Sequence, residues 1–125
     1  MPKVITTASQ ARLTVKRSKF HAMAFGAASM DEVQSQVETF ATKHRRSRHV
    51  CWACRVGASD EGLVEQMRDD GEVGRPGLVM LDMLRRRDLL GGIVVARYFG
   101  GVKLGVGGVS RAFREVAEAA LEGAV

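Results

Sequence analysis

The most informative stretch of this sequence is RYFGGVKLGVGGVSRAF, from Arg97 to Phe113. It joins the end of an apolar strand to a glycine-rich loop and then to an amphipathic helix. Glycines in such a loop permit positive φ angles and let a partner approach the backbone closely. Lys103, with Arg97 and Arg111 flanking the loop, adds positive charge beside a helix N-terminus, where free N–H groups attract anions. The loop glycines are Gly100, Gly101, Gly105, Gly107 and Gly108.

This loop matches neither common nucleotide-binding glycine motif. A Walker A loop would need a Gly-Lys-Ser/Thr ending at the required spacing, and the chain has none there. A dinucleotide fingerprint would need a third glycine at position 110, where Ser110 stands. Two interpretations remain open: a tight turn that packs strand against helix, or an anion site.

The segments before the loop alternate between strand and helix patterns. Ile93–Ala96 is an apolar run typical of a strand covered on both faces, after a break at Gly91-Gly92. Pro76 fits the first turn of a helix, and Arg85–Arg87 complement the dipole at its end. Ser29 and Glu32 predict a capping box for a helix that ends at about Lys43. Further strands are predicted over residues 10–16, 19–26, 49–56 and 63–68, with a turn at Arg17-Ser18 and a loop at Gly57–Asp60.

The predicted order is β-β-α-β-β-α-β-α. It indicates an α+β fold, a two-layer sandwich whose mixed sheet of about four to five strands carries the helices on one face. The last helix is predicted to bury one apolar stripe and to expose its charged residues. A length of 125 residues suits one core, so we predict a single domain over residues 1–125 and no second domain.

The composition excludes several classes of protein. Hydrophobic residues at 46% and charged residues at 26% are globular averages, which argues against disorder. An aromatic content of 6% argues against a broad aromatic platform for stacking bases. The net charge of +5 and pI of about 9.8 favour phosphate-bearing partners or acidic protein surfaces.

The same totals predict a cytoplasmic protein. The first residues form no signal peptide, and no segment approaches the roughly 18 apolar residues of a membrane span. Two cysteines give no disulfide framework, so a reducing cytosol is expected. We predict no membrane partner.

Cys51-Trp52-Ala53-Cys54, preceded by His44 and His49, suggests a zinc or redox site. The segment has a strand pattern, however, and residues three apart on a strand point to opposite faces. A thioredoxin-like pair would also need a helix start after a strand. We therefore predict two buried thiols and a core tryptophan, and neither a metal nor a cofactor.

Asp69-Asp70-Gly71-Glu72 could bind Mg²⁺ or act as acid and base, but a surface turn explains the cluster more simply. Arg75 is predicted to pair with these acids across the turn. The basic runs His44–His49 and Arg85–Arg87 are predicted to be solvated surface, and either could border a phosphate contact.

Taken together, these residues resemble the N-terminal domain of the IMPACT/YigZ family over nearly the whole chain. The similar motifs are Lys16–Phe20, Lys43-His44, His49–Ala53, Asp69–Glu72, Gly74–Pro76, and most specifically Arg97–Gly105 with Gly107-Gly108 and Arg111–Phe113. The resemblance implies a fold like the second domain of small-subunit ribosomal protein five. It also implies a link to translational control, which eukaryotic members exert through an activator of the general-control kinase. For bacterial members, contact with nucleic acid or the ribosome is the usual suggestion.

The chain departs from the family pattern in three places. Glu72 runs directly to Val73-Gly74, so the Pro-Ser-Gly-Thr stretch of the family is missing. Val50 replaces the usual asparagine beside His49. We also expect neither the ferredoxin-like domain of bacterial relatives nor the RWD domain of eukaryotic ones in this chain, so binding through an RWD domain is not expected to carry over.

We predict a non-enzymatic domain that binds RNA or the ribosome and modulates translation, with a translation-control protein as another candidate partner. Phosphate contacts are predicted for Lys103, Arg97, Arg111, Ser110 and the loop glycines, and Arg75 and His49 are expected to border the site. Two alternatives stay open. One is an enzyme that binds a small phosphorylated or nucleotide ligand, although no nucleophile–base pair stands out; the other is a protein-interaction module.

Overall fold

The computed structural model describes residues 2–58 and 62–125, and in them the predicted order of elements is confirmed, with one short strand added at the start. The strands are β1 (Lys3–Val4), β2 (Ser9–Val15), β3 (Ser18–Phe25), β4 (His49–Ala58), β5 (Gly62–Arg68) and β6 (Leu89–Tyr98). The helices are α1 (Met30–Lys43), α2 (Pro76–Arg86) and α3 (Gly105–Ala124). The fold is therefore α+β, as predicted.

One mixed sheet organises the molecule, with strand order β2-β3-β6-β4-β5. Neighbours along this order are antiparallel, whereas β1 pairs with β6 in parallel. β6 lies at the centre because Ile93–Ala96 are apolar and wholly buried, with β3 on one side and β4 on the other.

The predicted break at Gly91-Gly92 is wrong, because both glycines lie within β6. The ring of Phe25 lies over Gly92, where an added Cβ would come within 2.5 Å of the ring atom Cζ. Gly91 has a φ of 137°, which other residues rarely adopt. These glycines admit close neighbours without ending the strand.

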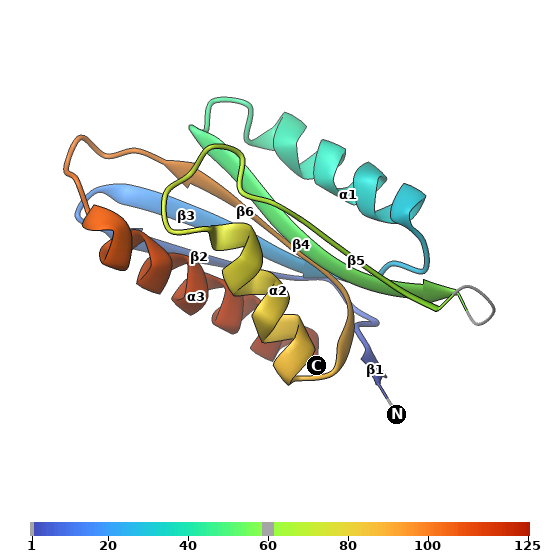
Figure 1. Cartoon of the computed structure of the whole chain (residues 1–125). Helices are drawn as coiled ribbons and strands as arrows, with labels where there is room; N and C mark the ends of the chain where they lie inside the picture. The colour runs from blue at the N-terminus through green and yellow to red at the C-terminus, as the bar shows by residue number, and fades with distance from the viewer. Residues whose placement is uncertain (1, 59–61) are drawn as a thin grey trace.

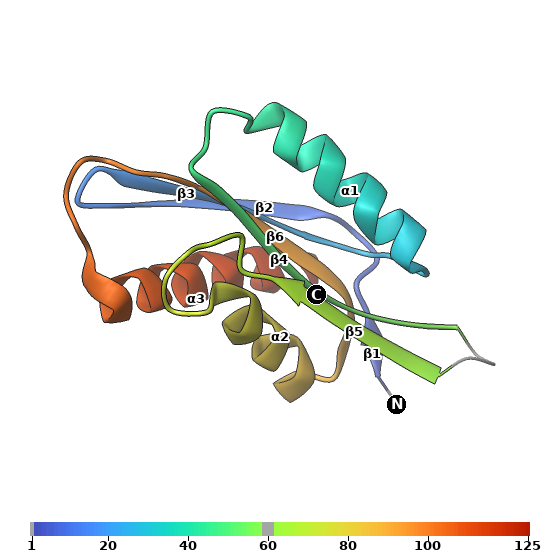
Figure 2. The ribbon, with the colours of Figure 1, turned by 45° about the horizontal axis from the view of Figure 1, so that its top comes forward.

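The helices cover both faces of the sheet, which corrects the predicted two-layer arrangement with all helices on one face (Figures 1 and 2). α2 and α3 pack with Phe20, Cys51 and Val95 in one core. α1 packs with Trp52, Cys54 and Val94 in a second core on the other face. β4 and β6 carry apolar side chains on both faces, and each face is therefore buried by its own layer of helices.

Several local predictions are confirmed at the level of single contacts. The Glu32 N–H donates to Ser29 Oγ at 3.3 Å, so Ser29 caps α1 as predicted. The Glu32 carboxylate accepts from the Ala28 N–H at 2.7 Å rather than from the Ser29 N–H expected in a capping box. Pro76 occupies the first turn of α2.

Two turn predictions change. The β2–β3 turn is formed by Lys16 and Arg17, whose φ angles are 44° and 71°, and Ser18 already belongs to β3. In the predicted loop Gly57–Asp60, Gly57 and Ala58 belong to β4, while Ser59 and Asp60 lie outside the described residues.

Cys51 and Cys54 point to opposite faces of β4, as their spacing predicted. Both thiols are buried. Burial raises the pKa of the Cys51 thiol, and the nearby carboxylates of Glu72 and Asp70 raise it further. In residues 2–58 and 62–125, no helix combines the length and apolarity needed to cross a membrane.

Candidate phosphate-binding cleft

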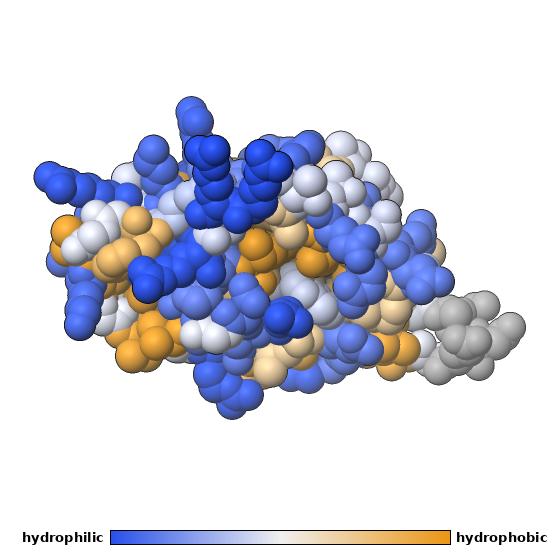
Figure 3. Space-filling view, turned by 90° about the horizontal axis from the view of Figure 1, so that it is seen from above, coloured by the Kyte–Doolittle hydropathy of each residue, from blue (hydrophilic) through white to orange (hydrophobic). Residues whose placement is uncertain are grey.

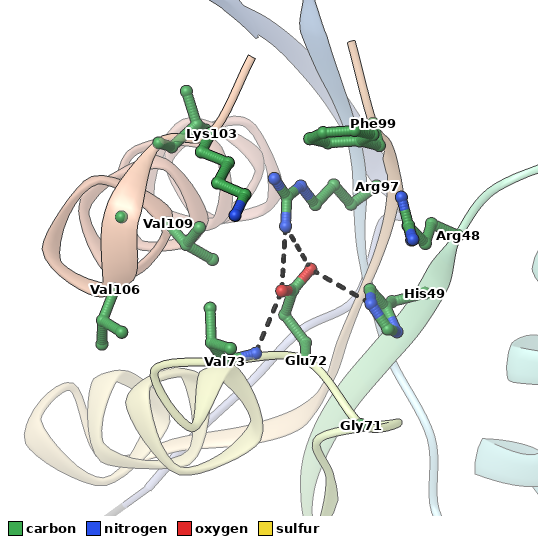
Figure 4. Close-up of a pocket in the computed structure, with 12 residues that line it drawn as sticks. Arg48, His49, Gly71, Glu72, Val73, Arg97, Phe99, Lys103, Val106 and Val109 are labelled. Carbon is green, nitrogen blue, oxygen red and sulfur yellow. Dashed lines mark hydrogen bonds and ion pairs between the residues drawn. The ribbon is translucent and has the colours of Figure 1, made fainter. Parts of the chain in front are cut away.

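A cleft of about 470 Å³ lies where the end of β6, the start of α3, the β5–α2 turn and the start of β4 meet (Figure 4). It is lined by Arg48, His49, Gly71, Glu72, Val73, Arg97, Phe99, Lys103, Leu104, Gly105, Val106 and Val109. Arg97 and Glu72 face each other across it, between Phe99 and Val73 (Figure 4). The cleft therefore combines apolar walls with a few charged groups, as small-ligand and phosphate sites do.

A buried ion pair joins two segments of the cleft. Arg97 and Glu72 are 6% and 8% exposed. Nη1 of Arg97 donates to both carboxylate oxygens of Glu72, at 2.9 and 2.8 Å. The Val73 N–H also donates to Glu72 Oε1, at 3.0 Å. Arg97 was predicted to contact phosphate, but its charge is already matched by Glu72, so it acts first as a structural support.

The rest of the Arg97 guanidinium lies among aromatic rings. Its central carbon is 5.7 Å from the Phe20 ring centroid and 5.8 Å from that of Phe99. Among the described residues, its Nε is buried without a hydrogen-bond partner. A buried donor without a partner is uncommon in proteins, so the ion pair and the two rings hold this side chain rather than a hydrogen bond at Nε.

His49 stands at the wall of the cleft, where it was predicted to border the site. Its Nδ1 lies 2.7 Å from the carbonyl oxygen of Asp70. A carbonyl only accepts, so Nδ1 carries the proton and donates. Its Nε2 then faces Glu72 Oε2 at 3.8 Å. The imidazole is thus held between the Asp70 carbonyl and the Glu72 carboxylate.

Two exposed cations stand at the rim. Lys103 lies in the cleft as predicted, and Arg48 joins it from the turn before β4. The Arg48 guanidinium carbon is 4.9 Å from the centroid of the Phe99 ring, and its backbone N–H donates to the Arg97 carbonyl at 2.7 Å. Arg48 was not singled out in the sequence, where it belongs to the basic run that could border a phosphate contact.

The N-terminus of α3 opens on the same cleft. Leu104 is the N-cap residue, and in the described part of the chain its apolar side chain makes no capping hydrogen bond. The first N–H groups of a helix lack partners within it and carry the positive end of its dipole. Gly105 has a φ of 73°, and apart from its own helix and its chain neighbours no described residue lies within 4 Å of the place where a Cβ would stand. Space and charge at this helix start therefore both suit an anion.

Other predicted glycines and Ser110 support packing. An added Cβ on Gly100 would lie 2.1 Å from the Arg17 carbonyl carbon, so this glycine lets the β2–β3 turn contact the loop. Ser110 Oγ donates to the Gly74 carbonyl at 3.2 Å, which ties α3 to the turn before α2. The remaining predicted residues lie outside the lining of the cleft, namely Gly101, Gly107, Gly108, Arg111 and Arg75.

The acidic turn is held together by its own carboxylates. Asp69 Oδ1 accepts from the Gly77 N–H at 2.8 Å, at the start of α2. Asp70 Oδ2 accepts from the Val50 N–H at 2.8 Å, and Oδ1 lies 3.3 Å from Arg68. The predicted pairing of Arg75 with these acids is wrong: in the described part of the chain none of them has Arg75 as a partner. Even without the family's longer loop, Glu72 reaches Arg97.

Comparison with known proteins identifies the relatives of this chain. The model of the Impact N-terminal domain matches residues 16–121. The chain is 39% identical over 110 residues to an IMPACT family member from Thermus thermophilus, covering 86% of this chain and 56% of that protein. It is 32% identical over 111 residues to YvyE of Bacillus subtilis, covering 87% and 50%. It is 35% identical over 102 residues to YigZ of Escherichia coli, covering 79% and 50%.

Solved structures agree with these sequence matches. The crystal structure of a hypothetical protein superposes with a TM-score of 0.87 at 30% identity, covering 95% of this chain and 59% of that one. The two-domain translational regulator Yih1 superposes with a TM-score of 0.63 at 25% identity, covering 96% and 50%. The chain spans about half the length of the curated relatives it matches. It belongs to the IMPACT family, and the region it shares with that family is the N-terminal domain.

Proposed function

We propose that this chain is a non-enzymatic domain that binds RNA or the ribosome and modulates translation, with phosphate contacts at the cleft. The observation that carries the proposal is the convergence of Lys103, Arg48 and the uncapped start of α3 on one cleft. Two cations that form no ion pair with any other described residue, together with a helix N-terminus, attract a phosphate more strongly than any one of them alone. The two unpaired buried thiols suit a reducing compartment, so we place this activity in the cytoplasm.

The family supports the same proposal. Yih1, which shares this fold, is described as a two-domain translational regulator. The net charge of +5 favours a phosphate-rich partner for the whole domain. A translation-control protein is the second partner class that this relative suggests.

The experiment is fluorescence anisotropy with a labelled single-stranded RNA of about 10 nucleotides at about 50 mM salt. The double variant Lys103→Gln with Arg48→Gln is expected to weaken binding by about tenfold, because two phosphate contacts are lost. Arg86→Gln with Arg114→Gln is the matched control, since both arginines are exposed on α2 and α3 and the change in net charge is the same. Equal losses in the two double variants would contradict a role for the cleft.

The shape of the cleft favours one second candidate, a small phosphorylated ligand. Its volume of about 470 Å³ and its apolar walls suit a nucleotide. Thermal denaturation with a panel of nucleotides, with and without Mg²⁺, separates the two candidates. A rise in melting temperature with a free nucleotide would favour the small ligand, and RNA binding without such a rise favours the first proposal.

A further inference from the structure

We infer that the uncovered face of β2 and β3 is a second contact surface, a track for single-stranded RNA that leads to the cleft. This inference rests on the proposed RNA-binding function and adds a surface outside the cleft. The open face consists of Gln10, Arg12, Thr14, Lys19 and His21.

The alternation of β2 shows which face is open. Ala11, Leu13 and Val15 pack against the core under α2 and α3. Arg12 and its neighbours two residues away therefore point to the opposite face, the α1 side of the sheet. α1 packs against β6 and β4. Among residues 2–58 and 62–125, no helix covers the α1 side of the β2–β3 hairpin (Figures 1 and 2).

The antiparallel register brings the polar side chains of the open face together. Arg12 is paired with His21, and Thr14 with Lys19. Such directly opposite pairs place their Cβ atoms about 5 Å apart. The two cations therefore come from adjacent strands and lie in neighbouring pairs along the hairpin.

The charge of the chain is concentrated on this hairpin. Residues 1–30 contain five lysines and arginines and no aspartate or glutamate, which equals the whole net charge of +5. Residues 31–125 contain 14 basic and 14 acidic residues and are neutral as a group. Four of the five cations, Arg12, Lys16, Arg17 and Lys19, lie on the hairpin or at its turn. Figure 3 views the molecule from the α1 side and shows hydrophilic side chains over much of that face.

Three aromatic rings border the open face beside the end of α1. The ring centroids of His21 and His44 are 4.9 Å apart, and those of His21 and Tyr98 are 5.7 Å apart. Nδ1 of His44 lies 2.8 Å from the Tyr98 hydroxyl. These rings are only partly buried, so they offer surface on which unpaired bases can stack.

The electrostatics of the two histidines agree with a cationic surface. Burial lowers the pKa of His21, and the charges of Arg12 and Lys19 lower it further. Burial likewise lowers the pKa of His44, followed by the effects of His21 and Lys43. The charged neighbours that act on this pair are cations, and a bound phosphate would offset their repulsion.

The track and the cleft meet at the end of β6. Tyr98 lies beside the open face, Phe99 lines the cleft, and Lys103 follows in the same loop. The hairpin turn also contacts this loop, because the Gly100 N–H donates to Ser18 Oγ at 3.2 Å. A chain of phosphates can therefore pass from one surface to the other. A single strand fits better than a duplex or an acidic peptide, since only unpaired bases use the aromatic rings.

The test compares a short and a long single-stranded RNA, of about 3 and about 10 nucleotides, by fluorescence anisotropy. Arg12→Gln with Lys19→Gln is expected to weaken binding of the long RNA by about tenfold and of the short RNA by less than about twofold. Lys103→Gln with Arg48→Gln is expected to weaken both. His21→Ala, which keeps the charge at neutral pH, is expected to weaken only the long RNA, by about fivefold.

The outcomes separate this inference from the proposed function. If Arg12→Gln with Lys19→Gln binds the long RNA as the unchanged protein does, the track is refuted while cleft binding stands. If the unchanged protein binds neither RNA, the proposed function fails and the track with it. Poly-glutamate and an RNA duplex are also tested as competitors of the labelled RNA. If either competes as well as the single strand does, the track is refuted in favour of a general polyanion or protein surface. Exposed polar positions carry all the charge changes, so the fold is expected to persist, which circular dichroism checks.

Discussion

Arg97 is the residue on which the cleft depends most. It extends from the central strand, lies between two phenylalanine rings, and is paired with a carboxylate 25 residues earlier in the chain. Two charges taken out of water are tolerable only when each satisfies the other. The ion pair therefore fixes the β5–α2 turn against β6 and so sets the shape of the cleft.

Removing one partner of this ion pair is expected to destabilise the protein strongly. Glu72→Ala leaves the buried Arg97 charge without its carboxylate, and we expect the free energy of unfolding to fall by about 3 kcal/mol. Urea denaturation measures the change. Glu115→Ala, at an exposed position on α3, is the control and is expected to shift it by less than about 0.5 kcal/mol. A loss below about 1 kcal/mol in Glu72→Ala would show that the pair does not hold the turn.

At the scale of elements, the β2–β3 hairpin and the loop before α3 act as one unit. The turn at Lys16-Arg17 leaves no room for a side chain at position 100. Gly107, by contrast, lies in the first turn of α3, and an added Cβ would meet only the flexible end of Arg111 at 3.3 Å. The two glycines belong to the same motif in the sequence, but only Gly100 is required by a close backbone contact.

Alanine at these two positions is expected to act in opposite directions. Gly100→Ala is expected to lower the free energy of unfolding by about 2 kcal/mol, since the loop or the hairpin turn must shift. Gly107→Ala is expected to be neutral or to raise it by about 0.5 kcal/mol, because alanine favours helix more than glycine does. Thermal and urea denaturation compare them. Equal destabilisation would mean that both glycines serve the same backbone constraint.

The histidines beside the open face give the fold a dependence on pH. The pKa values of His21 and His44 lie below the ordinary value of about 6.5, so the unfolded chain takes up protons first as pH falls. The contribution of these two histidines to the free energy of unfolding is therefore fully present above about pH 6.5 and declines as pH drops towards the lowered native pKa values. His21→Gln with His44→Gln is expected to flatten the decline in urea denaturation between about pH 7 and 5.5. An unchanged slope would contradict the lowered pKa values.

At the scale of the whole molecule, patterns local in sequence predicted the elements well. Ser29 with Glu32 and Pro76 mark helix starts through contacts within a few residues. The buried run Ile93–Ala96 even indicates a strand covered on both faces, although the helices were expected on one face. Which face α1 takes depends on packing between segments far apart in the chain, and no local pattern encodes it.

The cleft was predictable only in part for the same reason. Lys103, His49, Arg97 and Gly105 were singled out and line it. The pairing of Glu72 with Arg97 was missed, because a turn rich in Asp and Gly is typical of an exposed surface. Only the folded chain shows that the β5–α2 turn lies against the end of β6. Arg48 belongs to the basic run His44–His49, in which the sequence does not distinguish it from the other arginines. Contacts across long sequence separations need the three-dimensional structure.

Phosphate binding at the cleft is tested most sharply by the salt dependence of RNA binding. Plotted as the logarithm of affinity against the logarithm of salt concentration, each phosphate contact to a single strand contributes about 0.7 to the slope. Lys103→Gln with Arg48→Gln is expected to make the slope shallower by about 1.4, whereas Arg86→Gln with Arg114→Gln leaves it unchanged. A slope that is the same in the unchanged protein and in the cleft variant would contradict phosphate binding at the start of α3.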